Sequence, residues 1–210
     1  FEALWLVGVI ALLTGATVVV QASANMPRYG VSEYFGQLLI LFAVNQLGPF
    51  FTALVVIGRS GAALAAYVGG MRVTREIEAL EVMGIDPVHF VVLPAFWGMV
   101  VGIICLNLYF ALVAIVGGLL VAGATVNLAL LPSLAKVMEA LTFGDVLVCL
   151  LKGAAFGIPI AVVSSYYGLR VRSVRGVPQA SIKSVVFSMA TVIAANVLIT
   201  VVLNAMQPSG

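Results

Sequence analysis

The stretch GRSGAALAAYVGGMRVTREIEALEVMGIDP, residues Gly58 to Pro87, is the only long interruption in an otherwise strongly apolar chain. The chain has 10 basic and 8 acidic residues, hence 10 + 8 = 18 formal charges. Six of these gather between positions 72 and 86: Arg72, Arg75, Glu76, Glu78, Glu81 and Asp86. Apolar runs long enough to cross a bilayer flank the stretch on both sides. A charged segment in this position gives a soluble partner a place to act on a membrane domain.

The middle of the stretch predicts a separate amphipathic helix over residues 73–83. Val73, Ile77 and Leu80 recur at i, i+4 and i+7, so they share one face, which the helix cannot bury alone. The remaining surface is charged and offers two local ion pairs, each worth about 0.2–0.5 kcal/mol: Arg72–Glu76 and Arg75–Glu78. A solvated loop with local ion pairs would explain the charges, whereas the apolar face favours a docking element.

Turn residues mark both ends of this predicted helix. Gly69-Gly70 interrupts the preceding run, and Gly84 suits the left-handed conformation that often follows a helix end. Asp86 can cap the next helix, with Pro87 at its first position. We therefore expect the helix to stop sharply on both sides.

Composition predicts an all-α integral membrane protein with a single domain over residues 1–210. Apolar residues make up 63% of the chain and charged residues 9%, with a mean hydropathy of +1.21, whereas soluble domains are about 25% charged. Apolar segments of about 20 residues fit helices better than the shorter alternating strands of a barrel. We expect five spans, at about 3–24, 35–68, 87–123, 146–169 and 181–206.

Three further expectations concern the segments between and before these spans. The second span is too long to be straight, so a kink is expected at Gly48-Pro49. A short interfacial helix can form over residues 131–141. Because the chain starts at Phe1 without a methionine, we expect a missing interfacial segment on its N-terminal side.

The distribution of basic residues predicts the orientation in the membrane. The connections after the second and fourth spans hold seven basic residues: Arg59, Arg72, Arg75, Arg170, Arg172, Arg175 and Lys183. The opposite connections hold only Arg28 and Lys136. The positive-inside rule therefore places residues 58–87 and 170–180 in the cytoplasm.

A few polar residues interrupt the predicted spans. Lys152 is the sharpest example, because a charge in a span costs at least about 2.5 kcal/mol, although snorkelling or pairing with Asp145 would also explain it. Asparagine and glutamine in spans more often join helices than bind ligands. Gln46 is better placed than most, since it lies beside the Gly48-Pro49 break, where backbone groups open.

Several chemistries have no matching residues in the sequence. There is no G-x-x-x-x-G-K-[ST] motif, paired carboxylate cluster or Ser/His/Asp set, so we expect no enzyme and no nucleotide site. One histidine and two cysteines leave no metal cluster, and a net charge of +2 does not indicate nucleic acid. Cys105 and Cys149 are expected to be small core residues rather than a disulfide.

A resemblance to a known family rests on three segments: Leu47-Gly48-Pro49, Gly58–Ala66 (GRSGAALAA) and Met71–Pro87 (MRVTREIEALEVMGIDP). They resemble the MlaE/YrbE-type permeases, the membrane subunits of ABC transporters that work with MCE-domain proteins. The resemblance is dense from about Gln46 to Trp97. It is looser over the fifth span, and residues 1–35 match only in hydropathy.

The resemblance implies a homodimer in the bacterial inner membrane that moves phospholipid or a related lipid. It implies cytoplasmic ABC ATPase subunits that bind ATP and Mg, so this chain would hold no cofactor. It also implies a periplasmic ring of MCE-domain proteins and, often, a small STAS-domain protein. The six charges between positions 72 and 86 would then couple the permease to the ATPase.

The family usually has Arg-Glu before Leu-Gly-Pro, facing the lipid cavity, whereas this chain has the neutral pair Asn45 and Gln46. We expect the cavity near this pair, with Lys152 meeting an anionic head group. The predicted cavity residues are Asn45, Gln46, Pro49, Phe50 and Lys152. A secondary transporter or channel with no ATPase partner is the main alternative, and a non-transporting scaffold is the third. The Gly48-Pro49 break supports the transporter alternative, because secondary transporters use discontinuous helices, but the charged helix does not.

Overall fold

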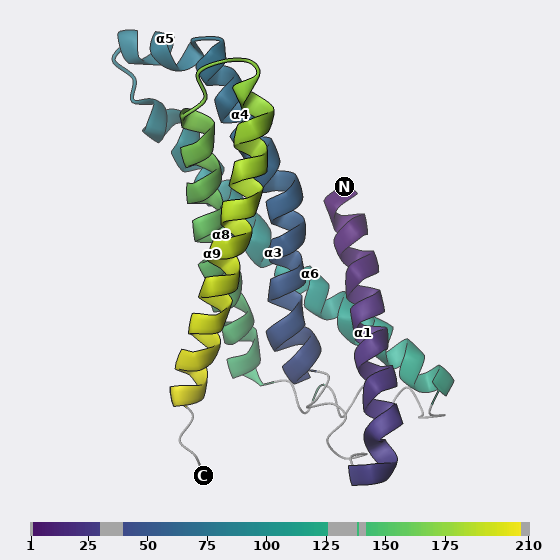
Figure 1. Cartoon of the computed structure of the whole chain (residues 1–210). Helices are drawn as coiled ribbons and strands as arrows, with labels where there is room; N and C mark the ends of the chain where they lie inside the picture. The colour runs from purple at the N-terminus through teal and green to yellow at the C-terminus, as the bar shows by residue number, and fades with distance from the viewer. Residues whose placement is uncertain (1, 30–39, 126–137, 139–141, 207–210) are drawn as a thin grey trace. The chain divides into compact units, whose positions relative to one another are not determined.

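The computed structural model describes residues 2–29, 40–125, 138 and 142–206 of the chain, and these residues form helices and turns without a strand. Five helical segments in the described part are long and apolar enough to cross a bilayer (Figure 1). They are Leu4–Gln21, Val44–Val73, Val88–Gly123, Phe143–Leu169 and Gly176–Val202. The all-α fold with five spans is thus confirmed. The interfacial helix predicted over 131–141 falls, apart from residue 138, outside the described residues.

The helices follow one another along the chain with short connections. The first span is α1 (Glu2–Tyr29). The second is one continuous helical run made of the π-helix η1 (Ile40–Leu47), α3 (Gly48–Val56), the π-helix η2 (Ile57–Gly61) and α4 (Ala62–Val73). The short α5 (Glu76–Val82) precedes the third span, which consists of the π-helix η3 (Val88–Val92) and α6 (Leu93–Thr125). The last two spans are α8 (Phe143–Leu169) and α9 (Gly176–Met206).

The π-helix η1 ends directly before Gly48-Pro49, where the sequence predicts a kink. Pro49 has no N–H, so the carbonyl of Asn45 loses its usual α-helical donor. Wider π turns accommodate such a gap, and they often occur at functional sites. The second span therefore stays helical through the proline, with its irregular turns on the N-terminal side.

The chain divides into two compact units, which are described separately. Unit 1 comprises Phe1–Thr52 and Cys105–Leu151, and unit 2 comprises Ala53–Ile104 and Lys152–Gly210. The boundaries fall inside α3, α6 and α8, so three of the five spans contribute residues to both units.

Glycines bring α1 and α6 into close contact in unit 1. A Cβ on Gly15 would lie 2.1 Å from the carbonyl oxygen of Ala114, and one on Gly117 would lie 2.9 Å from that of Leu12. Helix backbones approach this closely only where the side chain is a hydrogen atom. Because lipid offers no hydrophobic drive for helix association, such contacts are a main source of packing energy here.

A buried amide joins two other helices of unit 1. The Nδ2 of Asn107 donates to the carbonyl oxygen of Cys149 at 2.8 Å, and both residues are 1% exposed. Asn107 is thus a helix-joining asparagine of the predicted kind. Cys149 is the core residue that was expected, whereas Cys105 is exposed, so the core prediction is wrong for Cys105. Both cysteines are free thiols.

Small residues also pack α4, α8 and α9 together in unit 2. A Cβ on Gly168 would lie 2.8 Å from Val68 Cβ and 3.0 Å from the carbonyl oxygen of Ala65. The hydroxyl of Ser184 on α9 donates to Ser164 on α8 at 2.9 Å, and both serines are fully buried. Close backbones and hydrogen-bonded hydroxyls together hold this helix trio.

The tight contact at Gly15 can be tested by adding one methyl group. We expect Gly15→Ala to destabilise the folded chain by about 1–3 kcal/mol, the usual cost of overpacking. Gly102→Ala is the matched control, because a Cβ there would meet no atom of the described chain within 4 Å. Thermal unfolding in detergent, followed by size-exclusion chromatography, measures both. Equal melting temperatures for the two variants would contradict the close α1–α6 contact.

Candidate functional site

The helix that precedes α5 ends later than the sequence predicts. The prediction that Gly69-Gly70 interrupts it is wrong, because α4 continues to Val73. A Cβ on Gly69 would lie 2.9 Å from Val171 Cγ2, so this glycine serves helix packing rather than a break. The end comes at Thr74, whose N–H and hydroxyl both bond the carbonyl oxygen of Gly70, at 2.9 and 3.1 Å. Thr74 therefore occupies the carbonyl that further helical turns would have used.

Arg75 makes the turn between α4 and α5. Its φ of 64° is in the left-handed region, and it is the one non-glycine residue with positive φ in the described part of the chain. An L side chain in this conformation costs about 1–2 kcal/mol. The predicted helix over 73–83 is thus observed as α5, Glu76–Val82, with Val73 belonging to α4.

The break at Arg75 also changes the ion pairs. Arg72 lies 4.0 Å from Glu81 instead of pairing with Glu76 as predicted. Glu76 accepts a hydrogen bond from the hydroxyl of Thr74 at 2.7 Å. The i, i+4 rule assumes one continuous helix, and it fails here because the turn at Arg75 redirects the chain. All of these groups are at least a third exposed, so the pairs contribute little to stability.

The apolar face of α5 packs on its own chain. Ile77 is 2% exposed and lies against Leu64 and Val68 of α4, with Leu169 of α8 packed beside them. The expectation that this face is left unburied is therefore wrong. What α5 presents outward is Glu78 and Glu81, followed by Val82, which is 89% exposed. The short helix is anchored by one buried residue and offers a charged surface with an apolar edge.

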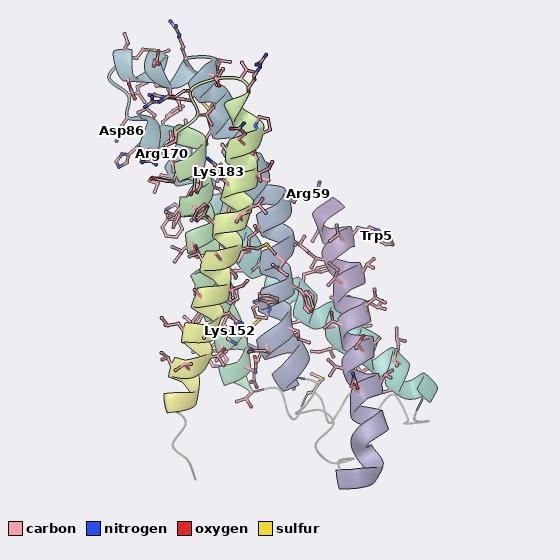
Figure 2. The ribbon with its side chains drawn as sticks, in the orientation of Figure 1. Trp5, Arg59, Asp86, Lys152, Arg170 and Lys183 are labelled. Atoms are coloured by element: carbon pink, nitrogen blue, oxygen red, sulfur yellow. The ribbon has the colours of Figure 1, made fainter. Side chains whose placement is uncertain are left out.

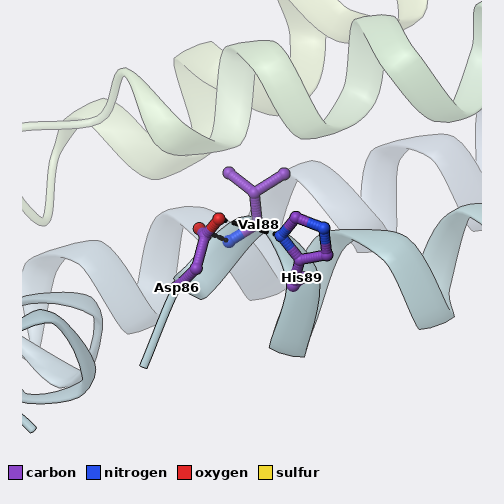
Figure 3. Close-up of polar contacts among 3 residues, drawn as sticks. All are labelled: Asp86, Val88 and His89. Carbon is purple, nitrogen blue, oxygen red and sulfur yellow. Dashed lines mark hydrogen bonds and ion pairs between the residues drawn. The ribbon is translucent and has the colours of Figure 1, made fainter. Parts of the chain in front are cut away.

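The residues after α5 form the predicted helix start. Gly84 has a φ of +74°, as its position after a helix end requires. The Val88 N–H donates to Asp86 Oδ1 at 2.9 Å, and His89 Nδ1 donates to Asp86 Oδ2 at 2.8 Å (Figure 3). Pro87 begins the next helix, so the predicted cap is confirmed. The hydrogen bond from His89 and the one from Val88 hold the pKa of Asp86 below its ordinary value of 3.8.

Both charged connections lie at the same end of unit 2. Figure 1 shows α5 and the turn between α8 and α9 together at one end, with the C-terminal end of α9 at the other. This turn holds Arg170, Arg172 and Arg175. The contacts of Gly69 and Leu169 described above join the same two regions. A shared side for the two connections agrees with the charge distribution, and their cytoplasmic location stays a prediction.

Four of the predicted cavity residues belong to unit 1 and surround the start of α3. Asn45 and Gln46 are half-buried at the end of η1, Pro49 is buried, and Phe50 packs near Phe51 with ring centroids 6.1 Å apart. They are neighbours along one helical run, at the irregular turns before the proline. This cluster is apolar apart from the two amides, a composition that suits lipid better than ions.

The partner of Asn45 was missed at the level of sequence. Its Nδ2 donates to Oδ1 of Asp145 at 2.6 Å, although the two residues are 100 positions apart. The other oxygen of Asp145 accepts from the N–H of Thr142 at 3.0 Å, so the carboxylate also caps α8. Thr142 and Asp145 form a variant of the capping box, and that spacing could have been recognised. The neutral amide at position 45 therefore binds a carboxylate that comes from another span.

Lys152 belongs to unit 2, so the structure does not bring it into one unit with Asn45 and Gln46. Its side chain is 4% exposed, which argues against snorkelling into solvent. It lies 18 residues before Arg170 on α8, about 27 Å along the helix axis. Figure 2 accordingly shows Lys152 far from the end of unit 2 that carries Arg170. Among the described residues, no group of three could hold a metal ion.

The fold and these sites define a multi-pass helical membrane protein with a short charged helix between its second and third spans. The family model described as Permease MlaE matches residues 1–202. The chain therefore belongs to the MlaE permease family.

Individual relatives carry names of the same kind. A probable ABC transporter permease protein of Rickettsia typhi is 29% identical over 201 residues, which cover 95% of this chain and 78% of that protein. Another from Synechocystis sp. is 31% identical over 195 residues, covering 89% and 73%. The intermembrane phospholipid transport system permease protein MlaE of Haemophilus influenzae is 36% identical over 115 residues, covering 55% and 41%.

Replacing Asp86 separates its two roles. Asp86→Asn keeps an oxygen for the Val88 N–H but loses the ionic contact with His89, whereas Asp86→Ala loses both. We expect melting temperatures in the order wild type, Asn variant, Ala variant at pH 7. A lowered pKa means that the carboxylate stabilises the fold above pH 3.8 and stops doing so as the pH falls further. The wild type should therefore lose its advantage over Asp86→Ala in acid, and an advantage that persists at pH 3 would contradict the assignment.

Proposed function

We propose that this chain is the permease subunit of an ABC transporter that moves phospholipid or a related lipid between the inner membrane and an MCE-protein partner. Separate ATPase subunits would bind ATP and Mg and drive the movement. The name of the Haemophilus relative supports the lipid class, and the names of the other relatives support the transporter class. In this proposal the chain works as a homodimer, with an optional STAS-domain protein, and has no catalytic residue of its own.

The construction of α5 carries this proposal. The helix exposes carboxylates at one end of unit 2, yet Ile77 ties it to α4 and, through Leu169, to α8. A push on the exposed face would therefore move two spans rather than a loose loop. The strained turn at Arg75 limits how far α5 can move independently of α4. The coupling surface in this proposal comprises Arg72, Arg75, Glu76, Glu78, Glu81 and Asp86.

The lipid would lie near the irregular turns of η1. Asn45 and Gln46 offer amide groups there, and Pro49 and Phe50 offer apolar surface. Because Lys152 is 4% exposed, we propose that it meets the head group only in the state that the ATPase cycle opens. A phosphate is a suitable partner for a lysine in a medium of low dielectric constant, since each ion reduces the cost of burying the other.

A secondary transporter or channel with no ATPase partner is the second candidate. The π-helix before Pro49 favours it, because such transporters use interrupted helices at their binding sites. It leaves the anchored, charged α5 without a role. An ATPase gene with a Walker motif next to the gene for this chain would favour the ABC transporter.

Charge reversal on α5 tests the coupling role. We expect Glu78→Lys with Glu81→Lys to weaken ATPase binding at least about tenfold, because facing charges of like sign repel. Glu78→Gln with Glu81→Gln, which removes charge without reversing it, should have a smaller effect. Co-purification of the ATPase with the tagged permease measures this, and an unchanged elution volume of the permease shows that it is folded. Undiminished ATPase recovery with the reversed variant would rule out this docking surface.

Lys152 and the η1 region can be tested together with lipid. We expect Lys152→Ala to raise the lipid concentration needed for ATPase stimulation roughly tenfold, the value of one charged hydrogen bond, and Lys152→Arg to retain most of the response. Photo-crosslinkers at Gln46 and Phe50 should capture phospholipid more efficiently than one at Cys105, which is exposed. Equal capture at all three positions would indicate bulk lipid instead of a site.

A further inference from the structure

A row of aromatic rings connects α8 to α9 close to the basic turn of unit 2. The rings of Tyr166 and Tyr167 meet edge to face with centroids 5.4 Å apart, and Tyr167 stacks on Phe187 at 5.3 Å. The guanidinium carbon of Arg170 lies 4.5 Å from the centroid of the Tyr166 ring. The row therefore begins at a cation held over a ring face, an arrangement that stabilises and orients the arginine.

A second cation follows from the helical spacing on α9. Lys183 is four residues before Phe187, so both lie on one stripe of the helix, one turn apart. Figure 2 shows Lys183 and Arg170 toward the same end of unit 2. We name these five residues the aromatic–basic cluster: Tyr166, Tyr167, Arg170, Lys183 and Phe187. A cation thus stands at each end of a continuous row of three rings.

The positive charge of the cluster is not neutralised by nearby acidic residues. From Val146 to Gly210 the sequence has five basic residues and no acidic one. In the described part of the chain, no ion pair involves Arg170 or Lys183. The carboxylates around α5 have their own contacts, with Arg72 for Glu81, Thr74 for Glu76 and His89 for Asp86. An anion is therefore the missing partner of the cluster.

The surroundings of the cluster are those of a membrane surface. Tyr166 is 47% exposed and Phe187 52%, and their α9 neighbours Ile182 and Val186 are 65% and 57% exposed. Tyrosine is enriched at the head-group level, where its ring meets lipid and its hydroxyl meets water. Arg170 directly follows the last residue of α8, at the same level as Lys183. The attraction of a helix C-terminus explains one arginine, but it does not explain the lysine on another helix or the row of rings between them.

We propose that the aromatic–basic cluster binds the phosphate of an anionic phospholipid in the leaflet on the α5 side, with the acyl chains along the exposed apolar side chains of α9. Arg170 and Lys183 hold the phosphate from two helices, and the rings of Tyr166 and Phe187 line the upper part of the chains. The lipid is a boundary lipid on the surface of unit 2, separate from any transported cargo. It holds α8 and α9 together at the end that carries α5.

Lipid selectivity in nanodiscs tests this proposal without the ATPase or transport. The full chain is placed in phosphatidylcholine nanodiscs with a trace of spin-labelled phosphatidylglycerol or spin-labelled phosphatidylcholine. Electron paramagnetic resonance measures the fraction of each lipid that is immobilised by the protein. We expect the wild type to prefer phosphatidylglycerol, and Arg170→Gln with Lys183→Gln to lower this preference by about fivefold for each cation removed.

The matched control is Arg172→Gln with Arg175→Gln, which removes the same two charges from the same turn but touches no ring of the row. It should keep most of the phosphatidylglycerol preference. A third variant, Tyr166→Leu, removes the ring under Arg170 and should lower the preference, whereas Tyr166→Phe should retain it. Raising the salt concentration should reduce the control's remaining diffuse attraction more than the site-bound fraction.

Three results would overturn the proposal. An equal loss in both double variants would mean diffuse electrostatic attraction without a site. No preference in the wild type would mean that no anionic lipid binds. Unchanged lipid selectivity combined with lost ATPase co-purification, or with a lost dimer, would make the cluster a protein contact. Because the measurement needs no transport, the lipid site can fail while the transport proposal stands, and the reverse also holds.

Discussion

In unit 2, the backbone of α8 at Gly168 lies so close to Ala65 and Val68 of α4 that a single added Cβ would clash. The fully buried hydroxyls of Ser164 and Ser184 join α8 to α9. In lipid, helices gain little from hiding apolar surface, so contacts of this kind decide which helices associate. The rest of unit 2 depends on this trio, because α4 leads into α5 and α8 leads into the basic turn. Close packing of the spans thus brings the two charged connections to one end.

The same trio gives α5 its mechanical character. A seven-residue helix would be only marginally stable alone. Here Ile77 enters a pocket of apolar side chains from α4, α6 and α8, and this burial holds the helix against the spans. The exposed carboxylates are then carried by a rigid support. An element that is polar outside and firmly seated inside is suited to transmit force from a soluble partner to the membrane domain.

Polar groups within the spans are few, and the described ones mostly serve structure. Asn107 binds a backbone carbonyl, Ser184 binds Ser164, and Asn45 binds the carboxylate that caps α8. Each of these satisfies a group whose burial in hydrocarbon would otherwise be costly. The neutral Asn45-Gln46 pair therefore has a structural reason at its first position, since an amide can donate to Asp145 where a second carboxylate could not.

The sequence alone determined the membrane class, the five spans and the cap at Asp86, because each depends on composition or on residues a few positions apart. Local reasoning failed where distant residues decide: Gly69 proved to be a packing residue against Val171, and Arg72 pairs with Glu81 because the chain turns at Arg75. The Asn45–Asp145 bond and the stack of Tyr167 on Phe187 join residues 100 and 20 positions apart. No periodicity in the sequence encodes such contacts. They exist only once helix packing has set which faces meet, so the tertiary structure decided them.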